Sequence, residues 1–488
     1  MTITTSISTA SQAPGAPEPG SPAAWAAHLA RVLQDQNRRV ERFGKYYAGT
    51  HPLQFASRTW TSHYGGIFQD FAMNYCGLIP DAIAERLQVD GFRIGKEPQA
   101  DDAANEIWAR NGMDGVSDTG HVEALYNGMA YHLVWPDDDD PDLATITLEH
   151  ASEVVVALDP INRRRRLAAL KVYRDPWGMD QYQLWTPDAF GRFKKGPDET
   201  VAQEISVVDN PLGIVPMVPL VPQPRSIGWP ISELERIIPL QDAINKLLAD
   251  TIVISEALAL PLRYILGWIE EAEADNADEN QIVKAARSAK ELLEGSLLTF
   301  PDPDTKVGQL QAADLTGHIG MLRELIQNVA TLSRIPFHYI LMNGGQIPSG
   351  EAIMSAEAGL ISITKRRARQ LGFGHKETMS LAFMIEGDEE KARETSSEVV
   401  WANPGTRSLA VEVDAATKKG AAPINVPMRQ LWEDIGYTPA QIARFDALRA
   451  LDELTAAMTQ LSAPAAPGQL EPGAPPAPAQ EPQPAAVA

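Results

Sequence analysis

The stretch PISELERIIPLQDAINKLLAD, residues 230 to 250, predicts a long helix. From Pro239 onward, apolar side chains recur at intervals of three and four residues, which places them on one face of an α-helix. Ser232 and Glu235 have the spacing of a capping box, which marks a helix N-terminus. We therefore expect a long helix of about six turns that reaches Leu258.

A second long helix is predicted from Asp314, where apolar residues again follow spacings of four and three as far as Val329. Pro336 should end it, because the residue before a proline avoids the helical conformation. Between the two helices lies a module with strand-like runs at 261 to 268 and 296 to 300 and a helix near 280 to 294. The module also contains EEAEADNADEN, which has six acidic residues and no basic one.

The N-terminal half changes period part-way along. Ser21 and Pro22 suit an N-cap and a first helical position, and helical segments are expected to about residue 127. Short β-like runs divided by turn residues then predict an antiparallel sheet; they cover 130 to 135, 144 to 148, 153 to 158, 166 to 173 and 180 to 185.

Two charged runs in this half have plain interpretations. DDDDPD, residues 137 to 142, lacks the glycine and the distal glutamate of a calcium loop, so a solvated turn is favoured. RRRR, residues 163 to 166, falls at a predicted hairpin tip, where it discourages sheet aggregation or contacts an acidic surface.

The stretch NGGQIPSGEA, residues 343 to 352, superficially resembles a phosphate-binding loop. That motif requires lysine and then a hydroxyl after the second glycine, but Glu351 and Ala352 stand there. Ser349 instead caps the next helix, and Glu351 suits its first turn. We expect this helix to run toward residue 386, with KRRAR (365 to 369) facing outward and kinks at Gly372 and Gly374.

A final helical block is expected over residues 405 to 462. Within it, Thr438, Pro439 and Gln441 have the pattern of an N-cap, a first helical position and a capping partner.

Composition limits the classes of function. The 488 residues include 42 Lys and Arg against 64 Asp and Glu, a net charge of −22, which disfavours a broad basic face that grips DNA phosphates. The single cysteine, Cys76, is expected to be a buried thiol in a reducing compartment. Neither a signal peptide nor a membrane span is predicted, and the chain ends rich in Ala and Pro are expected to be disordered. The nine histidines are scattered, so no metal site is indicated. The sequence also has no recognisable catalytic motif or cofactor-binding motif.

Several stretches, taken in order, resemble the portal proteins of tailed bacteriophages, in particular the siphophage type. They extend across roughly residues 25 to 460, and they are YYAGTHPLQFA (46 to 56), NYCGLIPDAIAERLQVDGFRI (74 to 94), PRSIGWPISELERIIPLQDAINKLLAD (224 to 250), ALPLRYILG (259 to 267), LTGHIGMLRELIQNVATLSRIPFHYI (315 to 340) and PSGEAIMSAEAGLI (348 to 361).

The resemblance implies an α+β, mainly α fold: a wing of helices and antiparallel sheet, a two-helix stem, a small α/β clip, a long kinked helix and a helical crown. Carried onto this chain, the expected segments are a disordered tail 1–20, wing 21–230, stem helices 231–258 and 314–336, clip 259–313, tunnel loop 337–349, long helix and C-terminal wing 350–404, crown 405–462 and a disordered tail 463–488.

The resemblance also implies partners and site residues. Such proteins form a dodecameric ring at the capsid vertex of the virion, assembled in the host cytoplasm with major capsid and scaffold proteins, through which double-stranded DNA passes. The tunnel loop facing DNA would include Asn343, Gly344, Gly345, Gln346 and Ser349. The clip would contact the terminase large subunit and later the head-tail adaptor; its acidic residues are Glu270, Glu271, Glu273, Asp275, Asp278 and Glu279.

An acidic chain suits a conduit, because every cation paired to a phosphate would hold the DNA back. Two other interpretations remain open at this point. One is a nucleotide-hydrolysing enzyme with a degenerate phosphate loop, and the other is a helical scaffold or adaptor protein without a channel.

Overall fold

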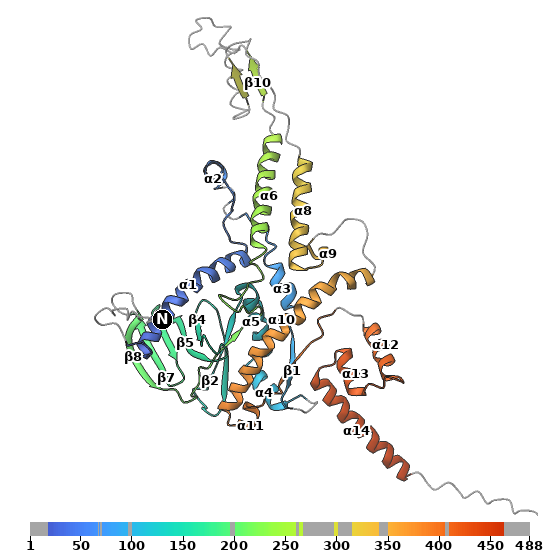
Figure 1. Ribbon diagram of the computed structural model, residues 1–488. Helices are drawn as coiled ribbons and strands as arrows, with labels where there is room; N and C mark the ends of the chain where they lie inside the picture. The colour runs from blue at the N-terminus through green and yellow to red at the C-terminus, as the bar shows by residue number, and fades with distance from the viewer. Residues whose placement is uncertain are drawn as a thin grey trace, which may run out of the picture.

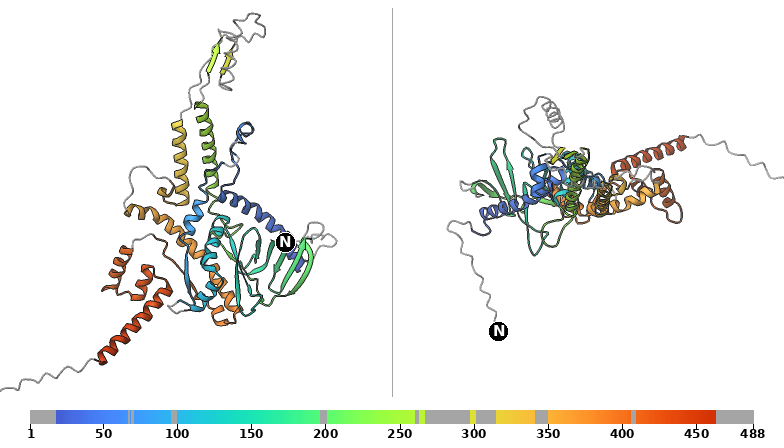
Figure 2. Two further views of the ribbon diagram at one scale, coloured as in Figure 1. Left: turned by 180° about the vertical axis from the view of Figure 1, so that it is seen from behind. Right: turned by 90° about the horizontal axis from the view of Figure 1, so that it is seen from above.

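The computed structural model describes residues 18–66, 68, 71–95, 100–195, 201–259, 263–266, 297–300, 315–340, 350–405 and 409–462. A body of helices and sheets occupies the centre (Figure 1). Two helices project from the body side by side, and three C-terminal helices lie on another side of it (Figures 1 and 2). The α+β class expected from the sequence is confirmed.

The first helix, α1 (Pro22–Ala48), begins where the sequence predicts. The Ser21 side chain accepts a hydrogen bond from the backbone of Ala24, and Pro22 occupies the first turn, where no N–H is needed. Four further helices follow before the main sheets: α2 (Arg58–Tyr64), α3 (Leu78–Ala84), α4 (Asp102–Arg110) and α5 (Met113–Asn127).

The strands form two antiparallel sheets where one was predicted. The five predicted strands are present as β2 (Ala130–Pro136), β3 (Ala144–Glu149), β4 (Val154–Leu158), β5 (Arg166–Arg174) and β6 (Asp180–Trp185). Three that the sequence analysis missed complete the sheets: β7 (Ala189–Lys195), β8 (Val201–Asp209) and β9 (Met217–Leu220). The strand orders are β3-β2-β9 and β4-β5-β6-β7-β8. There are two sheets because β9 pairs with β2 instead of adding to the second sheet, in which β4 to β8 follow one another in sequence order.

A smaller pair joins distant parts of the chain, and the sequence analysis missed it too. Strand β1 (Val89–Arg93) pairs antiparallel with β12 (Glu398–Trp401), with a register shift next to Gly91. A five-residue strand interrupted by glycine has little local signal, and its partner lies about 300 positions away.

The two projecting helices are α6 (Ile238–Ala259) and α8 (Leu315–Ser333), here called the column. Helix α6 starts later than predicted. The hydroxyl of Ser232 does not cap it but donates to the carbonyl of Tyr126, and residues 233 to 237 form turns. Pro239 then falls in the first helical turn, which tolerates its missing N–H.

Beyond the column, β10 (Arg263–Leu266) pairs in parallel with β11 (Leu297–Phe300), so both predicted strands of the intervening module are present. Helix α8 ends at Ser333, as the Pro336 argument predicted, and Arg334 adopts a left-handed conformation there. A short helix, α9 (Phe337–Ile340), follows within the segment that the sequence analysis treated as loop.

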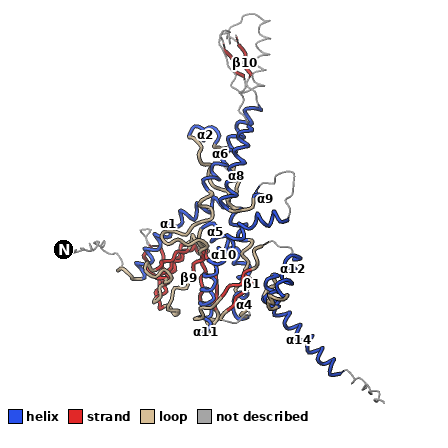
Figure 3. Tube along the Cα trace, turned by 45° about the vertical axis from the view of Figure 1, so that its right-hand side comes forward, coloured by secondary structure: helices blue, strands red, loops and turns tan. Residues whose placement is uncertain are grey.

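The longest helix, α10 (Gly350–Ile385), crosses the body and is continuous through both glycines (Figure 3). Gly374 has a packing role: a Cβ there would lie 2.6 Å from Leu220 Cδ2 and 3.1 Å from the carbonyl oxygen of Pro219. The prediction that residues 365 to 369 all face outward is wrong for Arg367, which is buried and paired with Glu233. Ala368 is buried beside it.

The short α11 (Glu389–Ala392) leads to β12, and the C-terminal block contains α12 (Leu409–Gly420), α13 (Met428–Ile435) and α14 (Pro439–Ser462). The predicted capping box is confirmed: Thr438 N donates to Gln441 Oε1, and Gln441 N donates to Thr438 Oγ1. Among the helices within the described ranges, none is long and apolar enough to cross a membrane.

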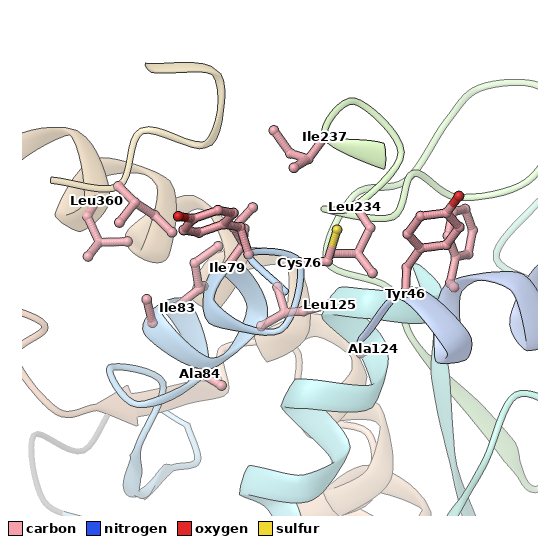
Figure 4. Close-up of a cluster of buried hydrophobic side chains, with 14 of the residues drawn as sticks. Tyr46, Cys76, Ile79, Ile83, Ala84, Ala124, Leu125, Leu234, Ile237 and Leu360 are labelled. Atoms are coloured by element: carbon pink, nitrogen blue, oxygen red, sulfur yellow. The ribbon is translucent and has the colours of Figure 1, made fainter. Parts of the chain in front are cut away.

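The largest apolar core lies where the column meets the body (Figure 4). It gathers side chains from α1, α3, α5, α6, α8 and α10 and from the turns before α6, among them Ile79, Leu125, Leu234 and Leu360. Burying this surface is the main driving force that holds the column on the body. Cys76 lies in this core, and burial raises the pKa of its thiol to about 12, in line with the buried thiol predicted.

Candidate functional site: the column and its anchors

The column forms because both helices have an apolar face turned toward a partner. Ile244 of α6 and Ile326 and Val329 of α8 are buried in the shared core, and partly buried leucines extend the contact. The faces turned away from this core remain apolar in places, since Ile252, Ile319 and Met321 are 43 to 57% exposed.

Buried polar side chains in the first turns of α6 form hydrogen bonds with the N-terminal half of the chain. Gln241 accepts from the backbone N–H of Tyr75 at 2.9 Å and donates to the carbonyl of Met73. Asn245 accepts from the Met73 N–H at 3.0 Å and contacts His51 Nε2 at 2.9 Å. We call Gln241, Asp242 and Asn245 the amide anchor of α6.

Asp242 completes this network on the side of α1. The Tyr46 hydroxyl donates to its carboxylate at 2.7 Å, and the Tyr46 ring stacks on His51 with centroids 4.1 Å apart. Burial, and then the bond to Asp242, raise the pKa of Tyr46, while burial lowers the pKa of His51. The tyrosine therefore keeps its proton, and this side of the network holds α6 by directed hydrogen bonds.

A second anchor fixes the chain on both sides of the segment 341 to 349. Arg86 of the α3 region donates to the Tyr339 hydroxyl at 2.7 Å, and that hydroxyl donates to Glu357 of α10 at 2.8 Å. The short α9 and the start of α10 are thereby tied to the same body. The first four residues of the predicted loop, 337 to 340, are consequently held in place.

A cluster of three histidines lies where α10 packs against α5 and β2. His121 of α5, His132 of β2 and His375 of α10 are fully buried, and His121 Nε2 lies 2.8 Å from His375 Nε2. The rings of Trp108 and Trp401 lie 5.3 and 5.7 Å from that of His375. Burial lowers the pKa of His121 to about 4 and of His132 to about 3, so these two rings are neutral at pH 7.

The residues that the sequence analysis placed at the functional ends fall outside the described ranges. This applies to the tunnel-loop residues Asn343, Gly344, Gly345, Gln346 and Ser349, and to the clip residues Glu270, Glu271, Glu273, Asp275, Asp278 and Glu279. The described structure does include the elements that flank these segments. Helices α6 and α8 flank the segment that carries the clip residues, and α9 and α10 flank the loop.

The sequence analysis did not identify the amide anchor or the histidine cluster. Gln241, Asp242 and Asn245 interrupt an apolar helix at spacings of one and three, a pattern that points to a buried polar contact but not to its partners. The three histidines carried no local signal, because 254 residues separate His121 from His375.

The family model for phage portal proteins described as SPP1 Gp6-like matches residues 28–434. The chain belongs to this family. It is a phage portal protein, and hence a structural component of the virion, as the resemblance predicted. The column and its anchors are consistent with a role in a DNA channel. The family match favours this interpretation over a nucleotide hydrolase or an adaptor without a channel.

The chain is similar in sequence to two mycobacteriophage portal proteins over most of its length. The portal protein of Mycobacterium phage D29 is 28% identical over 469 residues, covering 91% of each chain, and that of Mycobacterium phage L5 is 29% identical over 427 residues, covering 83% of this chain and 85% of its own. Among solved structures, a chain from the virion of a native gene transfer agent particle has a TM-score of 0.41 at 14% identity, covering 73% of this chain and 87% of its own. A chain from the neck of that kind of particle, computed with C12 symmetry, has a TM-score of 0.41 at 11% identity, with coverages of 80% and 96%.

Proposed function

We propose that this chain is the subunit of a dodecameric ring at the capsid vertex, through which DNA passes during packaging and ejection. The observation that carries the proposal is the column: two long helices held on a body of helices and antiparallel sheets by a common core and by the amide anchor. A subunit that forms part of a DNA conduit has to hold its shape while a polymer moves past it. Interlocked apolar and hydrogen-bonded contacts at the foot of the column provide that stiffness.

Within this proposal, α6 and α8 form the stem, although α6 begins seven residues after the start expected at 231. The segment 259 to 313, with its parallel strand pair, is the clip. The sheets, α1 to α5 and α10 form the wing, and α12 to α14 form the crown. The acidic residues at 270 to 279 would receive the terminase large subunit first and the head-tail adaptor afterwards.

Self-assembly is supported by apolar surface on elements that project from the body. Leu448, Leu451, Leu454 and Met458 of α14 are 50 to 63% exposed, and they recur at spacings of three and four. Together with the exposed apolar residues of the column, they leave apolar side chains uncovered in the single subunit. Packing between copies in a ring would cover it.

Electron microscopy of the purified full-length chain, with mass measured in parallel, tests the ring. We expect annular particles of about twelve subunits with a central hole. A particle without a hole, or a monomer at every salt and protein concentration tried, would contradict the conduit.

The segment 341 to 349 is the part of the tunnel loop that we propose faces DNA. Asn343, Gly344 and Gly345 are residue types that tolerate varied backbone conformations, which would suit a duplex whose symmetry differs from that of the ring. Replacing Gly344 and Gly345 by proline restricts the backbone there. We expect intact rings with impaired packaging, and normal packaging by such rings would argue against the loop.

A further inference from the structure

A cleft of about 870 Å³ opens on the outer side of α10, where the helix passes the foot of α8 and the turns before α6. Most of its lining comes from three separated stretches of chain, near residues 231 to 237, 332 to 334 and 354 to 369. The foot of the column and the long helix thus form the walls of one concave surface, here called the basic cleft.

The basic cleft concentrates positive charge in a chain whose net charge is −22. Five of its cations are exposed, and none has an ion-pair partner among the described residues; they are Arg236, Arg334, Lys365, Arg366 and Arg369. Both carboxylates of the lining are already engaged. Glu233 pairs with the buried Arg367 at 2.5 Å, and Glu357 accepts from Tyr339.

The cleft is apolar as well as basic. Leu332 is 53% exposed and Met354 is 42% exposed within the same lining. A surface for DNA would be dominated by contacts to phosphate and sugar, whereas mixed apolar and cationic side chains are typical of a protein partner. That partner should carry carboxylates.

The same chain carries two neighbouring carboxylates, both partly exposed, whose charge complements that of the cleft. Glu123 of α5 and Glu153, before β4, repel each other, and neither has a cationic partner among the residues that the structure describes. Burial, and then the charge of Glu153, raise the pKa of Glu123 to about 7. Nearby carboxylates without a counterion gain stability when a cation approaches.

Glu123 and Arg366 are directed away from the contact between α5 and α10. Helices α5 and α10 contact through His121 and His375. With 3.6 residues per turn, Glu123, two positions after His121, and Arg366, nine positions before His375, lie on the far sides of their helices. One subunit can therefore present its carboxylates to one neighbour and its cleft to the next.

We propose that the basic cleft receives the carboxylates of Glu123 and Glu153 from a second copy of this chain. The contact is head-to-tail, the kind that generates a closed ring when the rotation between copies closes. It rests on the ring assembly proposed above and adds the surfaces through which neighbouring subunits recognise one another.

The test is a charge swap in the full-length chain, with assembly followed by native mass spectrometry and electron microscopy. One variant carries Arg366→Glu and Arg369→Glu, a second carries Glu123→Lys and Glu153→Lys, and a third combines all four. The matched control carries Arg163→Glu and Arg164→Glu, which are exposed at the β4–β5 turn and distant in sequence from the cleft. Far-UV circular dichroism establishes that each variant is folded.

We expect each double variant to lower the population of rings at least about tenfold, because like charges then meet across the contact. The fourfold variant should recover rings, and the control should assemble like the unmodified chain. Normal assembly of either double variant, or folded double variants that the combination does not rescue, would overturn the proposal. So would intact rings of the Arg366 and Arg369 variant that bind a DNA duplex more weakly, since the cleft would then serve nucleic acid.

The unmodified chain separates this proposal from the proposed function. If it forms no ring under any condition, the conduit itself fails. If it forms rings and the charge swap has no effect, only the assigned contact fails.

Discussion

The amide anchor of α6 and the histidine cluster under α10 both bury polar side chains at the centre of the molecule, but in different ways. In the anchor, Gln241 and Asn245 are paired with backbone groups or with another side chain. In the cluster, His132 Nε2 and His375 Nδ1 have no partner among the described residues. Paired groups make a joint rigid, whereas unpaired imidazoles leave sites that a proton can occupy.

Breaking the anchor should have the largest effect. Gln241→Ala leaves the Tyr75 N–H and the Met73 carbonyl buried without partners, which should lower the free energy of unfolding by about 3 kcal/mol. Urea unfolding at fixed protein concentration measures it, and Gln54→Ala, on an exposed side chain, is the control. A loss as small as that of the control would mean that water or neighbouring groups replace the amide.

Acid should distinguish the cluster from the anchor. The pKa of His132 is about 3 in the folded chain and about 6.5 in the unfolded chain, so below pH 6.5 the unfolded chain binds a proton that the folded chain does not. Stability from this residue is complete above about pH 6.5 and falls by about 2 kcal/mol between pH 7 and pH 5.

His132→Gln removes the imidazole that binds this proton in the unfolded chain. The loss of stability between pH 7 and pH 5 should therefore be smaller than in the unmodified chain by about 2 kcal/mol. Glu123 titrates in the opposite sense, but it is present in both proteins and its contribution cancels. His28→Gln, on the exposed surface of α1, serves as the control. Equal pH dependence in all three proteins would show that the cluster accepts protons without cost.

The smallest effect tests how closely α10 packs beside the cluster. Gly374→Ala forces a Cβ to within 2.6 Å of Leu220, and after the gain in helix propensity we expect a net loss of about 1 kcal/mol in the free energy of unfolding. Gly320→Ala on α8 meets nothing within 4 Å and should instead stabilise by about 0.5 to 1 kcal/mol. Equal effects at both positions would mean that strand β9 yields to the added methyl group.

Much of the fold could be predicted because its signals are local. The caps at Ser21 and Thr438, the end of α8 before Pro336 and the strands β2 to β6 depend on residues within a few positions of one another. The candidate site was less predictable. Ser232 has the spacing of a cap but is used by Tyr126, and Arg367 sits in a basic run but is buried against Glu233. Their partners lie 106 and 134 residues away, beyond any local pattern.

By itself, the sequence determined where helices and strands form and, through ordered stretches across most of the chain, which family it belongs to. Both depend on neighbouring residues and on their order, which a single chain carries in full. Only the tertiary structure decided which polar groups are buried and paired, and that α5, β2 and α10 bring three histidines together. It also decided that five cations share one cleft with no ion-pair partner in the described part of the chain. Burial and pairing depend on contacts between segments that are distant in sequence, and folding alone brings those segments together.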